Sequence, residues 1–400
     1  MKSLMKYIFI PVLLVLLFIS CNEDPTSVGS DLIPDGDKLQ FKQLDSKETP
    51  VAQSSHFYEA NVNLGTSSIL LLGKNSNVES VILLRFFVPF SDSMVTFYKN
   101  NQFKIKQVWM EMVPTYKLGD ASQNFSFSVH QARSQWSSLG FNKDSLTSLN
   151  YDAQDIATSK TLNDTLLRFN IDTKVVEEWL KYRADSLSAP KNLGLFFKPS
   201  ANCQRFLGFN AYGLTDIPYL PLIRVEYEQK STFIDTLVAN PFMDQHVVTG
   251  AIPPQSQYIY LQGGLSLRGF LSFDISALPK DIVINSAKLE LSLDTLKTID
   301  GTPSSDSIFV KALKDSITKK LTADSLVVSV LKRNGNIYSG EITWLVQKWA
   351  SAIDDYSNQG VELSLSDEER SASRITIHGS KSEDITLRPR VKIIYMQKKQ

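Results

Sequence analysis

The 400-residue sequence is poor in several of the residues that mark common functional classes. It has two cysteines, Cys21 and Cys203, too few for a disulfide framework. Lys plus Arg and Asp plus Glu both number 42, and a net charge of zero argues against nucleic acid as a partner. None of the four histidines lies within zinc-ligand spacing of another, so the sequence predicts no metal cofactor of that kind.

Motifs for catalysis are also missing. The sequence has no Gly-x-Ser-x-Gly nucleophile elbow and no phosphate-binding P-loop. Neighbouring carboxylates at Glu177-Glu178, Asp354-Asp355 and 367–369 have the type needed for glycoside hydrolysis, but polar helix faces and loops carry such solvated charges routinely. We therefore expect a protein that is not an enzyme, with a secreted hydrolase as the least favoured alternative.

The chain begins with the features of a targeting signal. Lys2 and Lys6 precede an apolar run over Tyr7–Ile19, which is short for a membrane span. The run ends at Ser20-Cys21, which resembles the lipobox of bacterial lipoproteins in its looser Bacteroidetes form. By this resemblance residues 1–20 are a lipoprotein signal peptide and Cys21 is the acylated first residue of the mature chain. An ordinary signal peptide with an incidental cysteine is the alternative.

Residues 21–38 have the composition of a flexible tether. Gly, Pro, Asp and Ser dominate Ser27–Lys38 and favour turns. The acidic pair Glu23-Asp24 resembles the surface-export signal of Bacteroidetes lipoproteins, with a solvated acidic linker as the alternative. Gly29–Pro34 is similar to the mature N-terminus of an uncharacterised Bacteroidetes lipoprotein family. These resemblances imply an outer-membrane protein that is anchored in the membrane by the lipid on Cys21 and displayed at the cell surface.

The remaining chain reads as β structure that occurs twice. Short runs of alternating apolar and polar residues, such as Phe125–Val129 and Lys288–Leu293, are separated by turn residues. Five anchors recur in the same order in both halves. They are Phe86 with Phe273, Ile105–Met112 with Ile284–Leu291, Thr173–Trp179 with Thr343–Trp349, Asn192-Leu-Gly194 with Asn358-Gln-Gly360, and Pro221–Tyr227 with Pro389–Tyr395. The pattern predicts an all-β protein with two tandem jelly-roll-like β-sandwiches, at residues 39–228 and 229–400.

Each anchor has a physical interpretation. Thr173 and Thr343 are candidate helix N-caps, and the tryptophan six residues after each would pack on the sheet. Asn-x-Gly supplies a turn with positive φ, and the proline opens a closing strand. Taken in order, the anchors resemble the DNRLRE domain, a β-sandwich of secreted and surface proteins. Sandwich folds support many functions, so the resemblance implies architecture and location and leaves the ligand open.

Binding residues are expected where the two copies differ, above all in 90–104 and 136–150. Aromatic residues in polar, turn-rich surroundings are candidates for stacking on a sugar, although a core role is the favoured interpretation for the first. They are Trp136, Tyr212, Tyr258 and Tyr260. We expect a binding or adhesion module with carbohydrate as the leading ligand, or alternatively a structural or assembly protein that binds envelope proteins. Oxygen ligands in Asp300–Asp306 leave a structural calcium ion open, with a polar surface loop as the favoured interpretation.

One tripeptide is over-represented. Asp, then Ser or Thr, then an aliphatic residue or Met occurs nine times, which resembles the acceptor motif for O-glycosylation in Bacteroidetes. Turn formation by the aspartate explains the same pattern equally well. The candidate acceptors are Ser93, Ser145, Thr165, Ser186, Thr236, Thr295, Ser307, Ser316 and Ser325.

Overall fold

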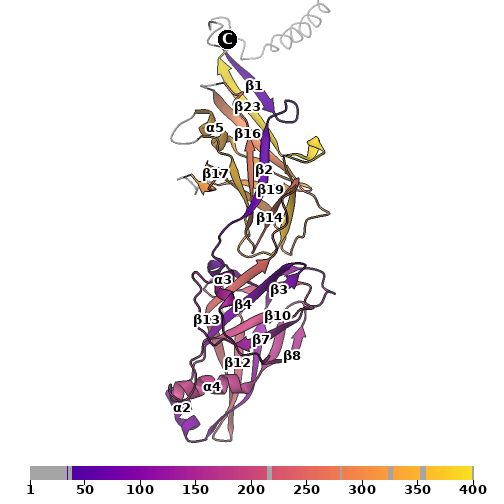
Figure 1. Ribbon diagram of the computed structural model, residues 1–400. Helices are drawn as coiled ribbons and strands as arrows, with labels where there is room; N and C mark the ends of the chain where they lie inside the picture. The colour runs from indigo at the N-terminus through magenta and orange to yellow at the C-terminus, as the bar shows by residue number, and fades with distance from the viewer. Residues whose placement is uncertain are drawn as a thin grey trace, which may run out of the picture.

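The computed structural model describes residues 34, 38–213, 219–279, 282–322, 328–351 and 357–398. This part of the chain is an elongated body made of two antiparallel β-sandwiches stacked end to end (Figure 1). The all-β fold predicted from the alternating runs is confirmed. None of the described helices has the combination of length and hydropathy that crossing a bilayer requires.

The first sandwich occupies the lower half of Figure 1. Its strands are β3 (Ile69–Asn75), β4 (Val78–Phe87), β5 (Phe103–Met112), β6 (Pro114–Leu118), β7 (Phe127–Gln131), β8 (Ala157–Leu162), β9 (Leu167–Ile171), β10 (Leu195–Pro199), β11 (Phe206–Asn210), β12 (Leu222–Gln229) and β13 (Phe233–Gly250). They pair in the order β6-β11-β3-β4-β13-β12-β5-β9-β8, with β10 joining β4 to β7. The helices of this half are η3 (Leu64–Thr66), α2 (Asp92–Lys99), α3 (Lys143–Thr147) and α4 (Thr173–Ala184).

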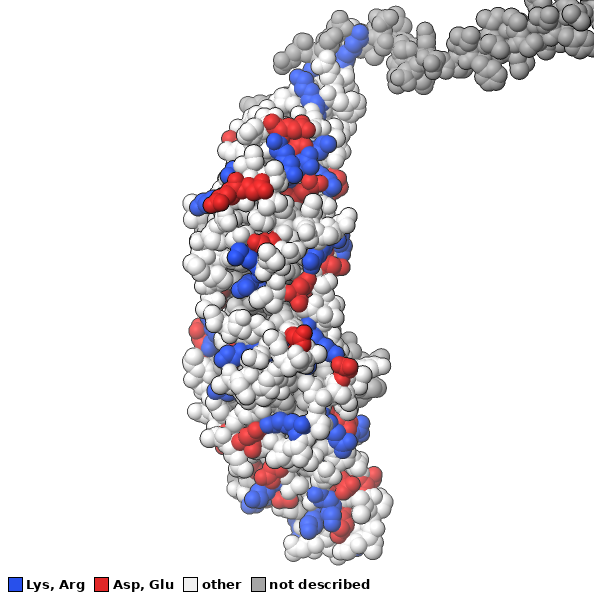
Figure 2. Space-filling model, turned by 90° about the vertical axis from the view of Figure 1, so that its right-hand side faces the viewer, with Lys and Arg blue, Asp and Glu red and all other residues white. Residues whose placement is uncertain are grey.

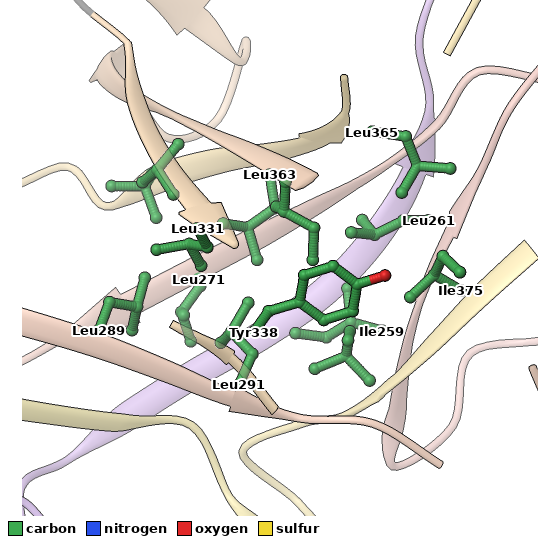
Figure 3. Close-up of a cluster of buried hydrophobic side chains, with 14 of the residues drawn as sticks. Ile259, Leu261, Leu271, Leu289, Leu291, Leu331, Tyr338, Leu363, Leu365 and Ile375 are labelled. Carbon is green, nitrogen blue, oxygen red and sulfur yellow. The ribbon is translucent and has the colours of Figure 1, made fainter. Parts of the chain in front are cut away.

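The second sandwich occupies the upper half. Its strands are β1 (Leu39–Asp45), β2 (Gln53–Glu59), β14 (Tyr258–Gln262), β15 (Leu267–Phe273), β16 (Val283–Ser292), β17 (Ser307–Asp315), β18 (Lys320–Leu321), β19 (Ser329–Asn334), β20 (Ile337–Glu341), β21 (Val361–Leu365), β22 (Arg374–His378) and β23 (Arg390–Lys398), and its helices are α5 (Thr343–Ser351) and η5 (Ile385–Leu387). Alternate residues of these strands fill the core, in which Leu and Ile side chains surround the fully buried Tyr338 (Figure 3).

The two sandwiches exchange their first strands. β1 pairs with β23 and β2 with β15, so residues 39–59 belong to the second sandwich. Conversely, β13 pairs with β12 and β4, so residues 233–250 belong to the first. The sequence-based limits of 39–228 and 229–400 are therefore wrong, because each range begins with strands that belong to the other sandwich. Alternation identifies a strand and its apolar face but does not identify the sheet that the strand joins.

The repeat itself is visible in the backbone turns. The Asn192 side chain donates to the Phe86 carbonyl at 3.0 Å and accepts from the Gly194 N–H. Asn358 does the same in the second sandwich, donating to the Phe273 carbonyl at 2.8 Å. Gly194 and Gly360 both have positive φ, as the Asn-x-Gly turns require.

The repeated helices lie at opposite ends of the body, with α4 at the lower end and α5 near the upper end (Figure 1). Asp172, not the expected Thr173, caps α4 by accepting from the Lys174 N–H. Thr343 instead accepts from the Ala287 N–H at 2.9 Å and so ties α5 to β16. The insertion at 90–104 forms α2, which packs on α4 and has no counterpart in the second sandwich.

The junction between the sandwiches is bonded as well as packed. Lys117 and Thr302 exchange two backbone hydrogen bonds of 2.9 and 2.7 Å. The buried Tyr116 hydroxyl accepts from the Ala372 N–H at 3.0 Å, and Val248 of β13 joins the core cluster of the second sandwich. These contacts join the two sandwiches through both hydrogen bonds and a shared apolar core.

Candidate binding site

The predicted sugar-stacking residues do not form one site. Trp136 is 9% exposed, and its indole Nε1 donates to the Leu193 carbonyl at 2.7 Å, so it is a core residue of the loop that carries α3. Tyr212 is half exposed in the bend after β11, where its backbone N–H donates to Asp244. Cys21, the predicted lipidation site, lies outside the described residues.

Tyr258 and Tyr260 do come together. They lie on the same side of β14 with ring centroids 6.1 Å apart, and His378 of β22 lies 5.4 Å from Tyr258. Lys297 and Arg374 each place their charged group over one of the two tyrosine rings, at 5.5 and 5.7 Å from the centroids. Because these cations occupy a face of each ring, the pair offers little free surface for stacking on a sugar.

The acidic loop considered for calcium is held by protein groups. Asp300 pairs with Arg333 at 2.5 Å and accepts from the Ser305 N–H. Across the described residues, no group of three or more His, Cys, Asp or Glu side chains has an arrangement that could hold a metal ion.

The possible glycosylation sites differ in exposure. Ser93, Thr165, Ser186, Thr236 and Thr295 are exposed, and Ser145 and Ser316 are half-buried. Ser307 is 2% exposed, so it cannot accept a glycan in the folded chain, and that prediction is wrong. Ser325 lies outside the described residues.

Several copies of this tripeptide have a local structural role. The carboxylates of Asp185, Asp294 and Asp315 each accept the backbone N–H of the aliphatic residue two positions later, at 2.8 to 3.0 Å. This is an Asx turn, which bends the chain at the end of an element. Turn formation therefore accounts for the motif at these three positions without a glycan.

Two carboxylates do meet at one buried point, on the side of β15 and β21 away from the core. Arg268 donates to Glu362 at 3.0 Å and to Glu368 at 2.8 Å. Tyr58 of β2 donates to Glu362 at 2.6 Å, and burial and this carboxylate raise the pKa of the tyrosine. Each carboxylate is below 10% exposed and already paired, so the cluster is a structural network that fastens β2 to the sandwich.

A cleft of about 610 Å³ lies beside α5 at the upper end of the second sandwich. Phe273 at the end of β15, with Ile275 and Leu278 after it, forms its apolar wall together with Trp349 of α5. Polar groups complete the lining from Gln53 and Ser54 of β2, Ser272, Asp274, Ser276 and Asn358. Two hydrogen bonds from Ser276 lower the pKa of Asp274, so this lining carries a carboxylate charge at neutral pH.

Two polar atoms in the cleft lining have no partner. The Trp349 Nε1 donor and the Gln53 Oε1 acceptor are both out of contact with solvent and form no hydrogen bond within the protein. Leaving such groups unpaired is costly, typically about 1–3 kcal/mol each. Because solvent does not reach either atom, a ligand in the cleft does not reach them in this conformation.

The matching end of the first sandwich is built differently. There α2 packs on α4, and Phe90 and Val95 from the insertion are buried in the core next to Trp179, which is 5% exposed. In the second sandwich this insertion is absent and Trp349, the repeat partner of Trp179, is only half-buried. The cleft is thus the space that α2 and its flanks cover in the other copy.

The recurrence of Phe273, Trp349 and Asn358 in both halves predicts a scaffold role for all three. The structure keeps that role for Phe273 and Asn358 but also places all three around the cleft. The sequence signal for the cleft is the missing insertion in the second copy. The insertion covers one end of the first sandwich, so its absence leaves the equivalent end of the second sandwich uncovered.

No protein-family model, curated protein or solved structure matches the chain. The candidate site therefore depends on its own geometry and chemistry.

Proposed function

We propose that this protein is a non-catalytic, lipid-anchored binding protein of the bacterial outer membrane, attached through Cys21, and that the cleft beside α5 binds a neutral saccharide. The observation that carries the proposal is the pairing of an aromatic wall, formed by Phe273 and Trp349, with several hydrogen-bonding side chains in one open cleft. Saccharides present both an apolar ring face and hydroxyl groups that donate and accept, which is the combination this lining offers.

The charge of the lining narrows the ligand class. Asp274 is the only charged side chain among the described residues that line the cleft. A carboxylate accepts hydrogen bonds from sugar hydroxyls but repels uronate, sulfate and phosphate groups. We therefore favour neutral sugars over acidic ones.

A glycan array with the Cys21→Ser mature chain, followed by calorimetry on the best neutral ligand, tests the proposal. Gln53→Ala removes a hydrogen-bonding side chain from the lining and should lower the affinity about tenfold, since the loss of a ligand hydrogen bond costs about 1–2 kcal/mol. Trp344→Ala is the matched control, because Trp344 is 38% exposed on the same helix and does not line the cleft. Binding that Trp344→Ala abolishes and Gln53→Ala leaves unchanged would place the site elsewhere.

A structural or assembly role is the second candidate, and the bonded junction favours it. A stiff body of two sandwiches suits a spacer that holds a partner at a set distance from the membrane. Figure 2 shows charges of both signs interspersed along the displayed face, with no extended patch of one sign that would select a strongly charged partner. Failure of every glycan to bind, combined with co-purification of one envelope protein, would favour this role.

A further inference from the structure

The second sandwich has an apolar surface at the end where the N-terminal segment enters it. Phe41 of β1, Met396 of β23 and Val283 of β16 are direct cross-strand neighbours, so their side chains project from the same side of the sheet. Phe41 is 69% exposed and Val283 is 56% exposed. Leu39, two residues before Phe41 on the same side of β1, is 59% exposed.

The apolar row formed by Leu39, Phe41, Val283 and Met396 lies outside the core. The next residues along the strands, Ile284 and Tyr395, point to the opposite side and are buried in the core cluster. The row therefore uses the outer side of the sheet, where a soluble protein normally carries polar residues.

Basic residues accompany the row. Leu39 pairs across the ladder with Lys398, and Lys38 precedes it. On the face that Figure 2 displays, the narrow upper end shows blue side chains and no red ones.

The position of this surface along the chain indicates its occupant. Leu39 follows Cys21 by 18 residues, so a lipid on Cys21 would keep β1 within about 60 Å of the bilayer even if the intervening chain were fully extended. At that distance the membrane is present at a high effective concentration. Exposed apolar side chains are the residue type that inserts at the interface of a bilayer.

We propose that the outer side of β1, β23 and β16 rests on the lipid bilayer, with Leu39, Phe41 and Val283 entering the headgroup region. The inference deepens the proposed function, because it rests on attachment through Cys21. The protein then contacts the membrane in two places, through the lipid on Cys21 and through the apolar row, and the second contact sets the orientation of the body on the membrane.

Brominated-lipid quenching of tryptophan fluorescence tests the contact. The mature chain is coupled through the Cys21 thiol to maleimide-bearing lipid in vesicles of phosphatidylethanolamine and phosphatidylglycerol, while Cys203 is 4% exposed and does not compete. Phe41→Trp adds the reporter. Ile234→Trp is the matched control, because Ile234 is 61% exposed at the β12–β13 hairpin of the other sandwich.

The Phe41→Trp chain should lose most of its added fluorescence in brominated vesicles, and the Ile234→Trp chain should lose none. Adding Val283→Asp to Phe41→Trp should restore the emission, whereas Ile337→Asp, at a position 43% exposed on β20, should not. Equal quenching of the two reporters would overturn the proposal. So would a dimer in sedimentation whose Phe41→Trp emission is already blue-shifted without vesicles, since a second copy would then cover this side.

Because the anchor in this experiment is chemical, its outcome does not depend on acylation in the cell. Acylation of Cys21 is checked by the intact mass of the native protein, and saccharide binding is measured in solution. The three outcomes are therefore independent of one another.

Discussion

The exchange of first strands makes a prediction that the sequence order alone would not. Phe57 lies on β2, about ten residues before the first strands of the first sandwich, yet it is 1% exposed in the core of the second. Its ring meets Tyr260 edge-on with centroids 5.1 Å apart, and it pairs across the ladder with Gly269. Phe57→Ala should therefore destabilise the second sandwich.

The expected effect is large. Replacing a buried phenylalanine by alanine costs about 3–5 kcal/mol, because the lost transfer free energy and the cavity add. A loss of about 4 kcal/mol corresponds to roughly a thousandfold fall in the protection of amide hydrogens that exchange by opening of that core. The fall should appear in peptides from β15, which pairs with β2, and from β21, which pairs with β15.

Hydrogen exchange followed by mass spectrometry measures this directly. Val247→Ala is the reciprocal control, because Val247 on β13 is 3% exposed and pairs with Val81 in the first sandwich. It should lower the protection of β4 by about 2 kcal/mol and leave β21 largely unchanged. If Phe57→Ala instead exposed β4 and spared β15, the exchanged arrangement of the strands would be refuted.

Three further predictions concern buried polar groups. Burial raises the pKa of Asp244 to about 6, so the stability that this group contributes is present below about pH 4 and is lost as the pH rises through 6. Asp244→Asn removes the buried charge and should therefore raise the free energy of unfolding at pH 7 by about 3 kcal/mol, measured by urea denaturation. Neither ring nitrogen of the buried His246 has a hydrogen-bond partner, so His246→Leu should raise the melting temperature at pH 7. Burial lowers the pKa of His246 to about 3, so the same substitution should reduce the loss of stability that calorimetry measures below pH 6. Glu368→Gln leaves Arg268 short of a charge partner in a buried network and should lower the free energy of unfolding by about 3 kcal/mol, an effect that Glu369→Gln, at a neighbouring exposed position, should not reproduce.

The strands and the repeat were accessible from the sequence because they follow from local chemistry. Alternation in Lys288–Leu293 predicts a strand whatever it pairs with, and the Asn-x-Gly turns at Asn192 and Asn358 require positive φ wherever they occur. The sequence does not predict which strand pairs with β1. Its pattern suits the edge of either sandwich equally well, and the choice of β23 depends on which free edge the folded body leaves open.

The candidate site was hidden for a related reason. Tyr258 and Tyr260 were expected as stacking candidates, but the cations above their rings come from Lys297 and Arg374, which are distant in sequence. Trp349 was expected in the core because its repeat partner Trp179 has the residue spacing of a core position. Its exposure depends on the absence of α2 from the second copy, which only a comparison of the two ends of the body reveals.

The exchange of strands also has a mechanical consequence for an anchored protein. A load from the proposed anchor at Cys21 enters the body at the N-terminal end of β1 and acts along the strand. Antiparallel hydrogen bonds are perpendicular to the strand, so the seven residue pairs of β1 with β23 share this load in shear. The chain then passes through β2, which is held by the buried Tyr58–Glu362–Arg268 network, before it reaches the first sandwich. Had residues 39–59 joined the first sandwich, the load would have bypassed the second one. The observed arrangement instead makes the sandwich nearest the proposed anchor bear the tension, and the return of the chain through β13 and β14 connects the two sandwiches at a second point.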